Sequence, residues 1–173
     1  MPVAEEPLII RDVFLQPGEF VWTDQNNRIK TLLGSCVAIV LYNAEKNIGG
    51  MCHIMLPEKK DFSAELNGKY ATDVIKMFLK EIEKSKTKPS DYTVKIFGGS
   101  NMFTAHERHI KDLSENVVRK SINEIGQKNV NKAKELLALH RFNISGESTL
   151  GSKHRKIYFN LWNGEVWMEM KKG

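Results

Sequence analysis

The sequence predicts a single mixed α/β domain, of the α+β type, with many short, mostly antiparallel strands and two or three helices. Two runs, Val37–Tyr42 and Ile48–Leu56, are too apolar for half-exposed strands, so we expect both to lie in the core. Between residues 67 and 86, apolar side chains recur at spacings of three and four, which is typical of an amphipathic helix. Asn163-Gly164 lies between alternating apolar residues and predicts a hairpin near the end of the chain.

Short strands and turns are expected before the two core strands. Residues 1–8 contain two prolines and predict a flexible N-terminal tail. Turn signals at Pro17-Gly18 and Asn26-Asn27 divide three short segments that predict strands, namely Leu8–Phe14, Gly18–Trp22 and Ile29–Leu33.

Helix and strand signals also alternate in the second half of the chain. Pro89 ends the first helix, and Tyr92–Phe97 predicts another buried strand. Apolar residues on one face predict a second helix over Asn129–His140. The terminal hairpin is expected to pair Lys156–Trp162 with Glu165–Met170. These elements predict one domain over residues 9–173.

Composition is consistent with one cytoplasmic domain. The chain has 173 residues and is 41% hydrophobic, which suffices for a domain that buries its own core. No apolar run reaches the roughly 18 residues of a membrane span, and no secretory leader pattern is present, so we expect a cytoplasmic protein without membrane insertion. The two cysteines form no recognisable disulfide framework, and free thiols are expected.

The net charge of +5 and the pI near 9.1 raise the question of nucleic-acid binding. Acidic residues are interspersed through most of the chain, and neither a long basic arm nor a recognition-helix signature is present. The charge therefore indicates a solvated surface and no nucleic-acid partner, and it also suits an acidic protein partner.

A cysteine and a histidine lie on two successive strand-like segments. Gly34 permits a tight turn that brings Cys36 to the rim of a sheet, and the next strand carries His53 back past it. A free thiol with a pKa of about 8.5 is mostly protonated at neutral pH, so a neighbouring base or cation must activate it. This pair is what thiol acyl transfer requires. The alternative is that Cys36 packs as a small hydrophobic side chain.

Gly98-Gly99-Ser100 follows the buried strand at 92–97 and has two interpretations. The glycines permit a tight turn at the strand exit, which is the favoured interpretation. They also expose backbone N–H groups that suit stabilisation of an oxyanion near an active site. The Gly-Lys-Ser/Thr ending of a phosphate-binding loop is absent.

Six segments in series resemble the CheD family of chemoreceptor glutamine deamidases. They follow the family's order between about residues 29 and 168, and together they are far more specific than any one of them. The segments are Thr31–Val37 (TLLGSCV), Gly49–Pro57 (GGMCHIMLP), Tyr70, Lys95–Met102 (KIFGGSNM), Ile125–Val130 (IGQKNV) and Arg155–Phe159 (RKIYF).

The resemblance implies a fold, a reaction and partners. The implied fold is a layered sandwich of packed sheets with helices outside, related to glutamine-deamidating toxins. The implied reaction is hydrolysis of glutamine side chains on methyl-accepting chemotaxis receptors to glutamate and ammonia, with Cys36 as nucleophile, His53 as base and no cofactor. A CheC-type phosphatase is the implied partner and regulator.

A third catalytic group is expected to orient the imidazole, and Thr31 is the candidate. Some relatives carry a threonine six residues before the cysteine, where this chain has Lys30, whereas Thr31 lies five residues before Cys36. Residues five apart on a regular strand lie on opposite faces, so we expect Thr31 to reach the site only if a bulge intervenes near Gly34. Backbone support for the oxyanion is expected from Gly34 and Ser35.

Residues 104–125 depart from the family pattern. A charged stretch with apolar residues on one face replaces a short connection, which predicts an inserted surface helix. His106 and His109 have a metal-ligand spacing, but no cysteine or further histidine lies nearby in the sequence, so no metal site is predicted.

Three hypotheses for function remain open. The first is the deamidase. The second is a catalytically weak binding module that docks on chemoreceptors or on a CheC-type phosphatase. The third is a thiol-metal or redox site, but Cys52 and His53 are adjacent on a strand and point to opposite faces, and no Cys-x-x-Cys spacing exists.

Overall fold

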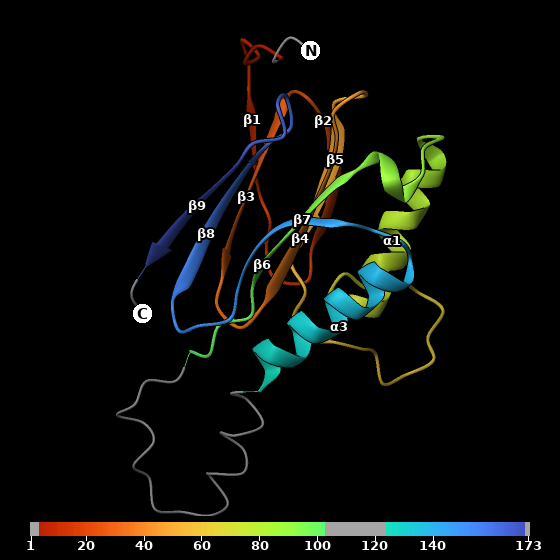
Figure 1. The fold of residues 1–173 in the computed structure, drawn as a ribbon, viewed down its shortest axis with the longest axis vertical. Helices are drawn as coiled ribbons and strands as arrows, with labels where there is room; N and C mark the ends of the chain where they lie inside the picture. Colours follow the sequence, from red (N-terminus) through yellow and green to blue (C-terminus); the bar gives the residue numbers. More distant parts are fainter. Residues whose placement is uncertain (1–3, 103–123, 172–173) are drawn as a thin grey trace, which may run out of the picture.

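The computed structural model describes residues 4–102 and 124–171, which form two packed sheets with helices on one side (Figure 1). One sheet has four strands in the order β1-β3-β8-β9, and the other has five in the order β2-β5-β4-β6-β7. Their bounds are β1 Arg11–Phe14, β2 Phe20–Asp24, β3 Asn27–Leu33, β4 Val37–Asn43, β5 Ile48–Cys52, β6 Thr93–Gly98, β7 Ile144–Thr149, β8 His154–Asn160 and β9 Val166–Lys171. The helices α1 (Ala71–Lys84) and α3 (Ile125–Leu139) pack against the five-stranded sheet, and a short 3-10 turn, η1, covers Pro89–Asp91.

The two faces of β4 bury two different cores. All seven residues of this central strand are buried. Side chains alternate along a strand. Val37, Ile39 and Leu41 therefore pack toward the helices. Ala38 and Val40 pack toward the four-stranded sheet. The expected layered sandwich with helices outside is therefore confirmed.

Most strand pairs are antiparallel, as predicted. Among the described strands, β1–β3 and β6–β7 are parallel, and the other five pairings are antiparallel. The predicted terminal hairpin is present as β8 and β9, with Gly164 at φ +74° in its turn. The short strands β1 and β2 are also present but lie in different sheets, because Gly18 turns the chain from one sheet to the other.

Two elements differ from the prediction. Strand β7 was not predicted, because Ser145, Gly146, Glu147 and Ser148 leave it without an apolar alternation. Helix α3 begins at Ile125, four residues before its predicted start, so Ile125 belongs to α3 and not to the predicted insertion. Residues 104–123 of that insertion, with His106 and His109, lie outside the described residues.

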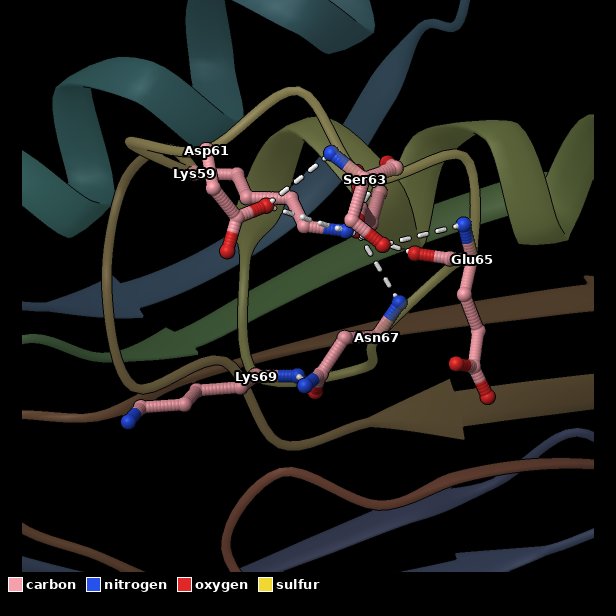
Figure 2. A network of polar contacts seen from close by, with 7 residues as sticks. Lys59, Asp61, Ser63, Glu65, Asn67 and Lys69 are labelled. Atoms are coloured by element: carbon pink, nitrogen blue, oxygen red, sulfur yellow. Dashed lines mark hydrogen bonds and ion pairs between the residues drawn. The ribbon is translucent and has the colours of Figure 1, made fainter.

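The connection from the His53 segment to α1 is organised around one lysine (Figure 2). Lys59 Nζ donates hydrogen bonds to the backbone carbonyls of Ser63 (3.2 Å) and Glu65 (2.6 Å), and it lies 3.5 Å from the buried Asp73 carboxylate on α1. Asp73 also accepts a hydrogen bond from the backbone N–H of Asn67. These contacts fix the loop that follows His53.

None of the described helices is long and apolar enough to cross a membrane.

Candidate active site

Thr31 and His53 meet between the two sheets. Thr31 lies on β3 between Ile29 and Leu33, which both face the inter-sheet core. β4 and β5 pair Val40 with Met51, and an isolated bridge continues this register by pairing Val37 with Ile54. His53 therefore lies opposite Ala38, whose side chain faces the core between the sheets. The Thr31 Oγ1 and His53 Nδ1 atoms are 2.7 Å apart, and the two residues are 0% and 2% exposed.

The contacts of Thr31 determine the tautomer of His53. The Thr31 hydroxyl donates its one hydrogen to the Leu15 carbonyl, 2.8 Å away. The hydroxyl oxygen must therefore accept a hydrogen bond from the imidazole, so Nδ1 carries the proton and Nε2 is left as the acceptor. The backbone of His53 is also fixed, because its N–H donates to the backbone carbonyl of Glu19 and its carbonyl accepts from the backbone N–H of Gly18.

Burial keeps the imidazole neutral. It lowers the pKa of His53, and the opposing effects of the Leu15 carbonyl and the Glu19 charge on that pKa are smaller. At neutral pH the ring is therefore a neutral base with an available Nε2.

Cys36 directly precedes β4 and lies on the same inter-sheet face. Its side chain is half-buried and packs at the edge of the core between the sheets. Extending the bridge between Val37 and Ile54 by one residue places Cys36 opposite Met55. Cys36 is then diagonal to His53, which lies two residues before Met55 on the same face. Burial raises the pKa of the Cys36 thiol. The resting pair is thus a neutral thiol and a neutral imidazole, and a thiolate forms only when the proton moves to a base.

Thr31 joins the site without a β-bulge. Strand β3 ends at Leu33, and a bend at Gly34 and Ser35 takes the chain into β4 of the other sheet. Thr31 is therefore on β3, whereas Cys36 directly precedes β4 of the other sheet, and the face alternation of one strand does not apply to the two residues. Thr31 reaches the site because the chain changes sheets between Leu33 and Val37, and not through the expected bulge.

Three successive carbonyls of the nucleophile turn, Gly34–Cys36, accept hydrogen bonds. The Gly34 carbonyl accepts from the Ser100 N–H (2.9 Å), and the Cys36 carbonyl accepts from the Gly99 N–H (2.8 Å). The Ser35 carbonyl accepts from Nδ2 of Asn129 (3.2 Å). The turn is therefore held from two directions, by the exit of β6 and by α3.

The predicted loop Gly98-Gly99-Ser100 thus lies directly against the nucleophile turn. Gly98 and Gly99 adopt φ values of +106° and +73°, and a Cβ atom on Gly98 would collide with the Cys36 carbonyl. The N–H groups of Gly99 and Ser100 are already used by carbonyls, which supports the tight-turn interpretation. The Ser100 hydroxyl lies 2.7 Å from the Lys153 carbonyl and accepts from the Arg155 guanidinium at 2.6 Å.

The N–H groups of the nucleophile turn differ from its carbonyls. Within the described part of the chain, the backbone N–H groups of Ser35 and Cys36 donate to no protein acceptor. Two unpaired donors beside a nucleophile suit the stabilisation of an oxyanion.

Cys52 lies on the opposite face, as predicted. Its sulfur contacts the backbone of Ile39 in the core beneath the helices, and burial raises its pKa to about 12. The Cys52 and His53 side chains therefore cannot bind the same metal ion or other ligand together. Within the described ranges, no group of three metal-ligating side chains occurs.

Asn129 is the site-proximal residue to which sequence reasoning assigned no role. It is 0% exposed on the first turns of α3, and Nδ2 donates to the Ser35 carbonyl and also to the Met55 carbonyl at 3.0 Å. Its presence in the IGQKNV segment was the only sequence signal, and that segment does not reveal what the side chain contacts.

Comparisons with known proteins show which family this chain resembles. A family model described as "CheD chemotactic sensory transduction" matches residues 55–170. "Probable chemoreceptor glutamine deamidase CheD 3" of Dechloromonas aromatica is 39% identical over 99% of this chain and 94% of its own length. "Probable chemoreceptor glutamine deamidase CheD 1" of Leptospira interrogans is 41% identical over 95% of each chain. Among solved structures, the Bacillus licheniformis hypothetical protein YfiH is 14% identical with a TM-score of 0.41, over 76% of this chain and 51% of its own.

Proposed function

This chain belongs to the CheD family, and on that premise we propose that it is a protein-glutamine glutaminase that deamidates methyl-accepting chemotaxis receptors with Cys36 as nucleophile. The observation that carries the proposal is the 2.7 Å contact between Thr31 and His53, because it leaves Nε2 of a neutral imidazole free to act as a base beside Cys36.

The first half-reaction forms a thioester. Nε2 of His53 takes the thiol proton as the Cys36 sulfur attacks the carbonyl carbon of the glutamine side chain. The oxygen of that carbonyl becomes an oxyanion, which the unpaired N–H groups of Ser35 and Cys36 stabilise. The tetrahedral intermediate collapses when the C–N bond breaks, and the imidazolium returns its proton to the leaving nitrogen as ammonia departs.

The second half-reaction reverses the roles with water. Neutral His53 takes a proton from a water molecule, which attacks the thioester carbonyl. The C–S bond then breaks, the imidazolium protonates the sulfur, and a glutamate side chain leaves. In both halves Thr31 accepts the Nδ1 hydrogen bond, which holds the ring in one orientation and stabilises its positive charge.

The test is ammonia release from cytoplasmic fragments of chemoreceptors. Wild type should release ammonia and Cys36→Ala should not. Cys52→Ala is the matched control, because this second thiol lies on the other face of the sheet and should be dispensable. Receptor binding by wild type without ammonia release would instead support the binding module. Regulation by a CheC-type phosphatase and a cytoplasmic location stay predictions.

A further inference from the structure

We propose that Asn129 is a positioning residue that aims the Cys36 N–H at the oxyanion. The inference rests on the proposed deamidase reaction. It starts from the observation that one buried carboxamide on α3 holds both halves of the site, the Ser35 carbonyl before the nucleophile and the Met55 carbonyl two residues after the base.

The orientation of the Asn129 carboxamide follows from its partners. Both nearby partners are carbonyl oxygens, which only accept, so the amide nitrogen must face them. The other atom of the group, Oδ1, is buried and has no hydrogen-bond partner among the described residues. An unsatisfied buried acceptor costs about 1–3 kcal/mol, so this residue is not explained as a simple contribution to stability.

Peptide geometry links Asn129 to the oxyanion donor. The Ser35 carbonyl and the Cys36 N–H belong to one planar trans peptide unit, in which they point in opposite directions. When Asn129 holds the carbonyl end toward α3, the N–H end points away from the helix, and no acceptor within residues 4–102 and 124–171 pairs with it. A hydrogen bond to the carbonyl also polarises the peptide and strengthens its N–H as a donor.

The helix that presents Asn129 is itself fixed against the same loop. Gly126 packs so closely on Gly99 that a Cβ atom on either would collide with the other segment. Gly99 in turn donates to the Cys36 carbonyl. Asn129 therefore approaches the nucleophile turn from a helix whose distance from that turn is set by backbone contact.

Two reactions of Cys36 distinguish this role from a general structural one. Deamidation passes through an oxyanion, whereas alkylation of the thiol by iodoacetamide does not. In Asn129→Ala, kcat for ammonia release should fall about 10- to 100-fold, a smaller loss than the roughly 100- to 1,000-fold expected when an oxyanion donor is removed outright. The alkylation rate of Cys36, and its dependence on pH, should stay within about two-fold of wild type.

Two further variants complete the experiment. Asn129→Ser keeps one donor and should give an intermediate kcat with the same alkylation rate. Asn43→Ala is the matched control, because Asn43 is also a buried asparagine, 1% exposed, but bonds the backbone of Lys46 at the far end of β4. It should leave kcat unchanged.

The outcomes separate this inference from the proposed function. Unchanged kcat in Asn129→Ala, a parallel fall in alkylation and kcat, or loss of the thermal unfolding transition in both Asn129 variants would overturn the positioning role. An inactive wild type, or an active Cys36→Ala, would overturn the deamidase itself.

Discussion

Thr31 Oγ1 lies 2.7 Å from His53 Nδ1, although Thr31 is on β3 and His53 directly follows β5, a strand of the other sheet. Thr31→Val removes this hydrogen bond and keeps the shape of the side chain. We expect turnover to fall about 10- to 100-fold with little change in receptor binding, as for loss of a hydrogen bond that orients the base. Thr31→Ser is the control and should retain most activity. Full turnover in Thr31→Val would assign the orienting role to another group.

Cys36 should ionise with more difficulty than a free cysteine. Burial raises the pKa of its thiol, so the thiolate fraction at pH 7 is smaller than in an unstructured peptide. The rate of alkylation by iodoacetamide should rise with pH through a midpoint above that of a cysteine peptide measured in parallel. Mass mapping should find Cys52 unmodified. A midpoint below that of the peptide would mean that a cation stabilises the resting thiolate.

His53 should make the fold less stable in acid. Its pKa is lowered in the folded state, so below the ordinary value of about 6.5 the unfolded chain binds the proton more readily. The contribution of neutral His53 to the free energy of unfolding is fully present above about pH 6.5, and it is lost as the pH falls through the lowered pKa of the folded state. Urea unfolding between pH 7.5 and 5 should show a decline that is smaller in His53→Gln. An equal decline in both proteins would contradict this assignment.

Gly98 should tolerate no side chain. It combines φ of +106° with direct backbone contact against the Cys36 carbonyl, so Gly98→Ala must shift the nucleophile turn. The control is Gly151→Ala, at φ +80° with open space around it, where only the backbone conformation is unfavourable. We expect Gly98→Ala to destabilise the protein by about 1–3 kcal/mol more than the control, and to lower turnover. Equal effects would show that the close contact is unimportant.

The sequence indicates the candidate site residues more readily than the way in which they meet. Cys36 and His53 are brought to one face by two neighbouring strands, which alternation and a short connection are enough to predict. The place of Thr31 depends on β3 pairing with β8, more than a hundred residues later, and no local pattern encodes that pairing. The same holds for Asn129, because its partners, Ser35 and Met55, are far away in the sequence.

Strand β7 shows a different limit. Its residues are mostly polar or small, yet they form a parallel pairing with β6 at the edge of the sheet. An edge strand is stabilised largely by backbone hydrogen bonds to its one neighbour, and such bonds leave little trace in the pattern of side chains.

Acyl transfer to Cys36 leaves a thioester that can be trapped. A reaction of wild type with a receptor fragment is quenched in acid at early times, and the digested protein is analysed by mass spectrometry. We expect a receptor peptide joined to Cys36 with loss of about 17 Da as ammonia, and no such adduct on Cys52. Sustained ammonia release with no adduct on Cys36, together with an active Cys36→Ala, would contradict it.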